Sequence, residues 1–145
     1  MATGDVVVFE ESKAVMLSGG WEAADSIKIA ILDNTTPPTA AFATPQLGDF
    51  TEVGAAGSYT AGGDVLDTWG TMVSEDAGVM TFDTGTNPTW AQHGSNDTDA
   101  YWRLVYNTTQ TGNLAIRYVE LGGPVDMQAG DLTITWNASG IFTIT

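Results

Sequence analysis

The feature that most constrains this chain is a series of short runs in which apolar side chains alternate with others. The clearest runs are 100–106 (AYWRLVY), 114–121 (LAIRYVEL) and 131–136 (DLTITW), and Gly and Asn lie between them. Successive side chains of a β-strand point to opposite faces, so this period predicts strands. Many short strands between turn signals are typical of an antiparallel β-sandwich or barrel. We therefore expect a mainly β fold with one short N-terminal helix.

Other segments predict further strands and that helix. Strands are expected at 26–32 (SIKIAIL), 65–73 and 79–82, with a short edge strand at 50–53. The valines before residue 9 favour a strand. The segment 9–17 has acidic residues early and a Gly pair after it, which favours a helix over those residues.

The last third of the chain predicts two hairpins. The runs 100–106 and 114–121 form the first, with a long polar loop between them. Strict alternation through the second run places Ile116 and Tyr118 on the same face. The run 131–136 and residues 141–144 form a closing hairpin. Because that hairpin has no charge after its first residue, we expect both of its strands to lie well inside a sheet.

Length and charge limit the organisation and the partners. The 145 residues predict a single domain, 1–145, with a possible N-terminal arm at 1–9 and a long surface excursion at 35–58. Eighteen acidic and four basic residues give a formal net charge of −14, which makes nucleic acid an unfavourable partner. No apolar run approaches the roughly 20 residues of a membrane span. Cysteine is absent, so disulfides and thiolate zinc sites are excluded.

The residues capable of acid–base chemistry show no catalytic pattern. His93 is the only histidine, and no nucleophile-elbow sequence surrounds any serine. The acidic pairs Glu75/Asp76 and Asp64/Asp67 are typical of solvated charge, although paired carboxylates could serve a glycoside hydrolase. We therefore predict no catalytic residue, no cofactor and no enzymatic activity.

One segment is rich in the oxygen ligands that calcium prefers. Residues 95–99 (SNDTD) make Asp97 and Asp99 weak calcium candidates. The spacing and closing Glu of an EF-hand are missing. Apart from these two, we predict no metal ligand.

Apolar and aromatic residues outside the clearest strands are candidates for an interface with another protein. They are Val6, Val7, Val8, Phe9, Trp21, Phe42, Phe50, Trp69 and Trp90. Trp102 and Trp136 lie in alternating runs and are expected in the core. Exposed Trp side chains would also suit a sugar-binding surface, which keeps a carbohydrate-binding module as an alternative.

Several segments together resemble a known family. They include SIKIAIL, GSYTAGG at 57–63, RLVYNTT at 103–109 and GDLTITWNASGIFTI at 130–144. Over about residues 7–145 the chain is similar to a family of small structural proteins encoded by tailed bacteriophages. The resemblance implies a non-enzymatic virion protein, and we favour capsid decoration (cement) over a tail component. The chain differs in length and motif from the small lambda-type decoration proteins.

The resemblance and the charge together suggest an oligomeric state, a partner and a location for this chain. We expect a homotrimer bound to the major capsid protein at the virion surface, after synthesis in the host cytoplasm. Residues 1–9 or the excursion 35–58 would contact the shell, where strand addition is one available mode. The alternatives are a receptor- or carbohydrate-binding β-sandwich at a tail tip, and an acidic hydrolase with two carboxylates converging in a cleft.

Overall fold

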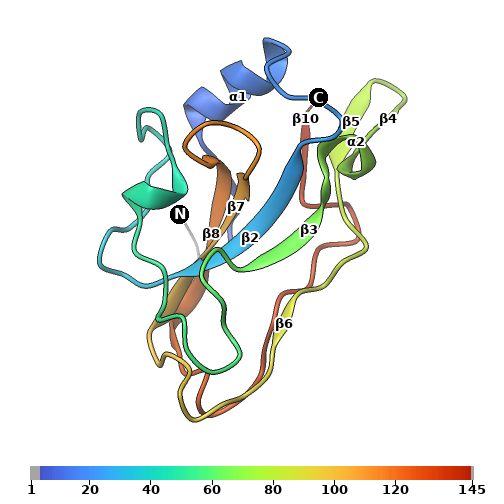
Figure 1. Cartoon of the computed structure of the whole chain (residues 1–145). Helices are drawn as coiled ribbons and strands as arrows, with labels where there is room; N and C mark the ends of the chain where they lie inside the picture. Colours follow the sequence, from blue (N-terminus) through green and yellow to red (C-terminus); the bar gives the residue numbers. More distant parts are fainter. Residues whose placement is uncertain (1–3, 145) are drawn as a thin grey trace.

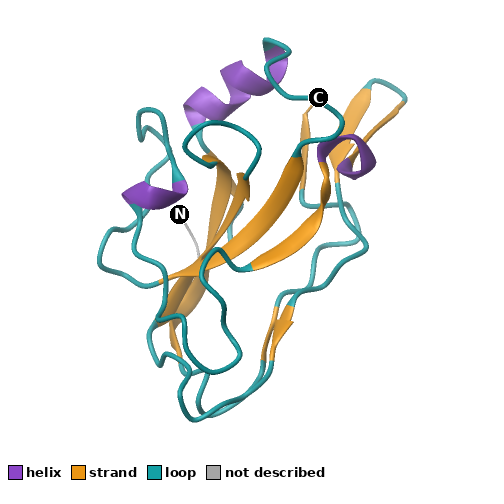
Figure 2. Cartoon of the chain, viewed as in Figure 1, coloured by secondary structure: helices purple, strands orange, loops and turns teal. Residues whose placement is uncertain are grey.

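The computed structural model describes residues 4–144, and its strands form antiparallel sheets (Figures 1 and 2). The largest sheet has five strands in the order β1–β8–β7–β2–β3. Its members are β1 (Val7–Val8), β2 (Ser26–Leu32), β3 (Asp64–Thr68), β7 (Ala100–Asn107) and β8 (Leu114–Val125). The mainly β, antiparallel fold expected from the alternating runs is confirmed, as is the hairpin of β7 and β8.

Smaller elements pack against this sheet. A three-stranded sheet, ordered β10–β5–β4, contains β4 (Val73–Asp76), β5 (Val79–Phe82) and β10 (Phe142–Ile144). The strands β6 (Thr89–Trp90) and β9 (Leu132–Thr133) form a separate ribbon. The helices are α1 (Glu10–Leu17), α2 (Trp69–Met72) and a 3₁₀ turn, η1 (Leu47–Asp49). The helix predicted at 9–17 is thus confirmed to within one residue.

The five-stranded sheet has an apolar cluster on each face, which gives a sandwich-like arrangement. Ile27, Ile29 and Ile31 of β2 are fully buried in the cluster that also contains Phe82 of the small sheet. Ala30, on the opposite side of β2, belongs to the second cluster. The alternation of the SIKIAIL run therefore supplies both clusters from one strand.

The N-terminal segment is part of the fold rather than a free arm. Val7 and Val8 pair with Tyr118 and Arg117 at the edge of the five-stranded sheet. Phe9 is fully buried, with its ring 5.0 Å from that of Tyr118. The expectation of an arm over 1–9 is therefore wrong for residues 7–9, because apolar burial holds them on the sheet. Residues 1–3 lie outside the described residues.

The excursion 35–58 covers one face of the sheet instead of extending from the surface. Leu47 and Phe50 are buried in the second cluster, and Phe42 packs against Phe50 with ring centroids 5.3 Å apart. The edge strand expected at 50–53 is reduced to a bridge between Leu32 and Glu52. The segment lies on the sheet because burying its apolar side chains there lowers the free energy of the chain, whereas exposing them to water would raise it.

The strand predicted at 65–73 is interrupted. β3 ends at Thr68, and α2 turns the chain into β4. The backbone N–H groups of Trp69 and Gly70 donate to the carbonyls of Asp25 and Ala23, at 2.7 and 2.9 Å. A Cβ at position 70 would lie only 2.6 Å from the Cβ of Ala23. The two segments can approach this closely because Gly70 has no Cβ.

The closing hairpin was predicted incorrectly. β9 pairs with β6, and β10 pairs with β5 at the edge of the small sheet, so the two strands do not pair with each other. A tight turn diverts the chain, with Gly140 at φ +88° and a bridge from Asn137 to Gly140. The alternation itself was right, because Leu132 and Ile134 are buried.

A β-bulge breaks the predicted alternation of β8. Val105 pairs with Arg117 whereas the next residue, Tyr106, pairs with Ala115, so Ile116 is an extra residue. Ile116 therefore packs in the first cluster and Tyr118 in the second, against the expectation that they share a face. The bulge also places the guanidinium of Arg117 beside the ring of Trp136.

Candidate functional site: an apolar groove

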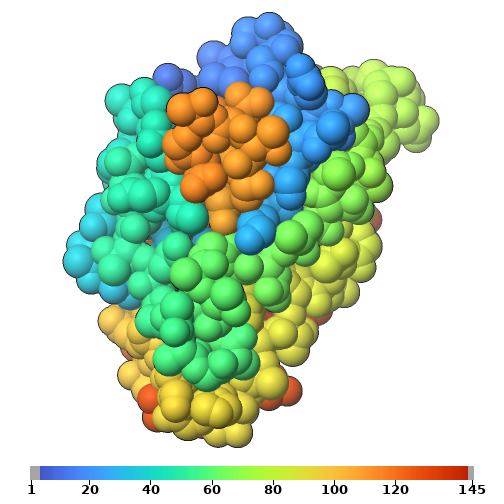
Figure 3. Space-filling view, in the orientation of Figure 1, coloured from blue at the N-terminus to red at the C-terminus, as the bar shows by residue number. Residues whose placement is uncertain are grey.

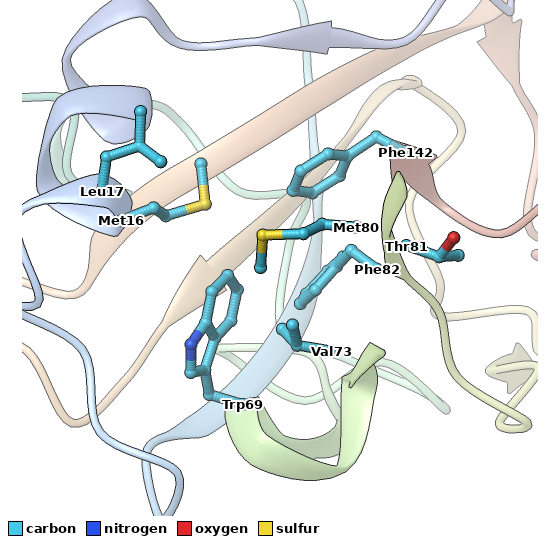
Figure 4. A pocket seen from close by; sticks show the side chains of 8 residues that line it. All are labelled: Met16, Leu17, Trp69, Val73, Met80, Thr81, Phe82 and Phe142. Carbon is cyan, nitrogen blue, oxygen red and sulfur yellow. The ribbon is translucent and has the colours of Figure 1, made fainter. Parts of the chain in front are cut away.

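An apolar groove lies between the C-terminal end of α1 and the three-stranded sheet (Figure 4). It has about 360 Å³ of free volume, which includes space open to solvent. Its side chains come from five elements: Met16 and Leu17 of α1, Trp69 of α2, Val73 of β4, Met80, Thr81 and Phe82 of β5, and Phe142 of β10. Side chains that are separated by up to 126 positions in the chain thus form one apolar surface.

Aromatic packing fixes the floor of the groove. Phe82 pairs with both Val73 and Phe142 across the small sheet, and its ring centroid lies 4.9 Å from that of Phe142. The ring of Trp69 lies 5.0 Å from Phe82 and contacts Trp21 edge-on at 4.6 Å. These contacts hold the floor in place without help from a ligand, because Trp69 and Phe82 each pack against two other rings.

The rim, in contrast, is exposed and adaptable. Leu17, at the edge of the groove, is 72% exposed, and Met80, whose side chain lies between those of Phe142 and Phe82 in Figure 4, is 41% exposed. Only Val6 and Val65 are comparably exposed among the large apolar residues of the described chain. Methionine side chains are flexible and adjust to different apolar contacts, so this rim can adapt to an incoming side chain.

The surface around the groove is acidic. Glu75 of β4 pairs with Met80, and the exposed Glu75 and Asp76 lead into the β4–β5 turn, which projects from the body (Figures 1 and 3). Of the four Lys and Arg residues in the chain, only Lys13 is exposed. Asp25 is the one buried carboxylate among the eighteen acids. The negative charge of the chain is therefore almost wholly at its surface.

The nine interface residues proposed from the sequence fall into two groups. Four are buried within the chain: Phe9, Trp21, Phe50 and Trp90. The prediction that these four face a partner is wrong, because their side chains fill the two clusters. Val6 is exposed, and the remaining four are half-buried: Val7, Val8, Phe42 and Trp69. Trp69 alone of the nine lines the groove.

The tryptophans do not gather into a sugar-binding platform. Trp21, Trp90 and Trp102 are buried, and Trp69 and Trp136 are half-buried. Trp102 lies in the second cluster, as expected. A flat aromatic surface for a sugar ring would need exposed faces.

The proposed calcium segment is occupied by structural hydrogen bonds. Asp97 accepts from the backbone N–H of Gly54 at 2.9 Å and from Thr98 at 2.8 Å. The buried Asn96 donates to the carbonyls of Ala91 and Met127 and accepts from Ser58. Within residues 4–144, no three His, Asp or Glu side chains gather so that they could hold a metal ion. Asp99 is exposed on the same loop.

Two arginines pack against the half-buried ring of Trp136. The guanidinium carbons of Arg103 and Arg117 lie 5.3 and 5.1 Å from the centroid of its ring. Arg117 is 1% exposed and donates from Nη1 to the carbonyl of Ile141 at 2.7 Å. Its Nε and Nη2 have no hydrogen-bond partner in the described part of the chain. Burial, and then the charge of Arg103, lower the pKa of Arg117 from its ordinary value to about 9.

The segment 57–63, one of those that carry the resemblance, has a structural role. The buried Tyr59 hydroxyl donates to Oε2 of Glu52 at 2.7 Å and accepts from the N–H of Ile31 at 3.1 Å. Burial and the neighbouring carboxylate raise the pKa of Tyr59. Gly63 has φ +61°, and a Cβ there would lie 1.9 Å from the carbonyl oxygen of Ile29. The loop is thus fastened to β2 and tolerates only glycine at that position.

Sequence reasoning missed most of the groove. It identified Trp69 but not Met16, Leu17, Met80 or Phe142. A signal was present in VMTF at 79–82, where the alternation places Met80 and Phe82 on one face. The alternation does not say whether that face is covered, because α1 and β10 reach it from distant parts of the chain.

Comparison with protein-family models, with curated proteins and with solved structures found no match to this chain. Among residues 4–144, neither helix combines the length and the apolar character needed to cross a bilayer. The functional interpretation therefore depends on the groove, the charge and the sequence resemblance.

Proposed function

We propose that this chain is a non-enzymatic structural protein of a tailed-phage virion, bound to the outer shell as a capsid decoration (cement) protein. The sequence resemblance supports the virion assignment. The groove supports a role in contacting another protein, because exposed apolar surface with a charged surround is typical of protein–protein sites. The single observation that carries the proposal is the exposed pair Leu17 and Met80 over a rigid aromatic floor.

The distribution of charge supports the same role. A surface with one exposed Lys and seventeen acids that are not buried suits a basic face on the shell and keeps free subunits apart. In the decorated particle, three copies surround a local threefold axis and contact the major capsid protein across subunit boundaries. Such a clamp adds contact area that must be broken before shell subunits separate.

The test is the composition and structure of the parent particle. Purified virions are analysed by mass spectrometry and by cryo-electron microscopy, with empty heads and isolated tails prepared in parallel. Density for this chain on the outer shell supports decoration. Density only in the tail overturns decoration and leaves a tail component. Virions that lack the chain overturn the virion assignment altogether.

A further inference from the structure

We infer that the apolar groove receives an apolar side chain from a basic segment of its partner, one in which lysine or arginine flanks that side chain. The identification of the partner as a shell protein rests on the proposed function, but the chemistry of the occupant follows from the groove itself.

The size and shape of the groove suit a side chain rather than a large ligand. The space enclosed within the groove is about 40 Å³, far below the roughly 300–1,000 Å³ of small-molecule sites. The floor of Trp69, Phe82 and Phe142 is apolar and already packed, so an occupant gains contact without rearranging it. Leu17 and Met80 are exposed and flexible, so both can shift to contact an inserted side chain (Figure 4).

The charge beside the groove selects a basic flank. Glu75 and Asp76 are exposed on β4, and Glu22 is exposed next to Trp21, which packs on the groove floor. Lys13, the one exposed residue among the four Lys and Arg, lies a helical turn before Leu17. Acidic charge therefore exceeds basic charge around the groove.

A second copy of this chain is a poor occupant by the same reasoning. Each copy has a formal net charge of −14, so two copies repel each other overall. Like charges brought together at an interface oppose association. The groove is therefore assigned to a basic partner rather than to contacts within the trimer.

Methyl NMR of the full-length chain tests this inference directly. With ¹³C-methyl methionine, the signals of Met16 and Met80 report on the groove, and buried Met127, which is not among the groove residues, serves as the internal reference. The probe is a short synthetic peptide with a Leu-Phe pair between lysines. Two comparison peptides have glutamates in place of the lysines, or lysines without the Leu-Phe pair.

We expect saturable shifts of Met16 and Met80 with the first peptide and about tenfold weaker binding of either comparison peptide. Leu17→Gln combined with Met80→Gln weakens the first peptide by about tenfold or more, while Val65→Gln, which also removes an exposed apolar side chain, leaves it unchanged. Glu75→Gln with Asp76→Asn weakens it by about threefold to tenfold, and Asp99→Asn, on the loop before β7, does not.

Each outcome bears on the inference. Equal binding of the lysine-only peptide shows that the acidic surface, not the groove, attracts it, and overturns the inference. Preference for the glutamate peptide overturns the assignment of a basic flank. Shifts of Met16 and Met80 that depend on protein concentration without peptide assign the groove to a second copy instead. If the chain binds the peptide but is absent from purified virions, the groove chemistry is upheld and the proposed function is refuted. If the chain is present on virions but binds no peptide, the proposed function is upheld and this inference is refuted.

Discussion

Replacing Arg117 by Met tests how the fold tolerates a buried cation. Arg117 is almost fully buried, its neighbour Arg103 is also a cation, and only its Nη1 has a hydrogen-bond partner. Methionine has a similar length and no charge. We expect Arg117→Met to leave the fold intact and to be neutral or stabilising at neutral pH, as apolar replacements of buried charges often are.

The magnitude follows from the pKa. Lowering the pKa of Arg117 from its ordinary value to about 9 corresponds to a cost of about 5 kcal/mol for holding the charged form in the folded chain. The variant avoids this cost but leaves the carbonyl of Ile141 unpaired, at about 1–3 kcal/mol, and loses the contact with Trp136, worth about 1–2 kcal/mol. The net change at pH 7 is therefore about 0–3 kcal/mol in favour of the variant.

The dependence on pH gives the sharper result. A basic group with a lowered pKa releases its proton from the folded chain first, so above about pH 9 the unfolded chain binds more protons until its own arginine titrates. The stability of the wild type therefore rises relative to the variant in that window. Between pH 7 and about pH 10.5, the difference in free energy of unfolding between the two proteins changes by about 2 kcal/mol in favour of the wild type.

Urea unfolding followed by tryptophan fluorescence, at pH 7 and pH 10.5, measures both free energies of unfolding. The pKa values of Tyr59 and Tyr118 are raised, and that of Tyr106 is raised to about 12, so their ionisation destabilises the fold above about pH 10. Both proteins contain these tyrosines, so the effect cancels in the difference. A gap that stays constant from pH 7 to 10.5, or a variant less stable by more than about 3 kcal/mol at pH 7, would refute the reasoning.

Three further substitutions test the rest of the fold. Gly63→Ala brings a Cβ against the backbone of Ile29 and should lower the free energy of unfolding by at least about 3 kcal/mol; a melting temperature within a degree or two of wild type would contradict this. Asp25→Asn removes a carboxylate whose pKa burial alone would raise, but which hydrogen bonds from side-chain amides and one backbone N–H lower overall. Its loss should cost about 1–3 kcal/mol at pH 7, and because the stabilisation is lost as pH falls through the lowered pKa, the deficit should shrink below about pH 4 in acid titrations followed by circular dichroism. Asn96→Ala breaks bonds that join three loops and should destabilise by about 2–4 kcal/mol, whereas added calcium should leave the wild-type melting temperature unchanged; a clear rise with calcium would restore a metal site at Asp97.

The alternation of single runs could be read without any tertiary information. The strands 26–32 and 79–82 have the bounds that their sequences predict, and Leu132 and Ile134 are buried as expected. Such predictions succeed because a strand buries every second side chain whatever its neighbours are. The helix at α1 was equally accessible, since its acidic start and the glycines after it act within a few residues.

Which strands pair, and which faces of the sheets are covered, could not be predicted from single runs in the same way. The bulge at Ile116, the divergence of β9 from β10 and the folding of 35–58 over the sheet all depend on contacts between distant segments. The same limit hid the groove: Met16, Met80 and Phe142 are unremarkable apolar residues in their own segments.

The sequence by itself therefore determined the class of fold, the acidic surface and the period of each strand, because these depend on composition and on neighbours along the chain. The tertiary structure alone decided which apolar faces are covered, which aromatic residues fill the clusters and where an uncovered face remains. Burial is a property of the whole packed chain, and α1, α2, β5 and β10 leave an apolar surface open only once they have met.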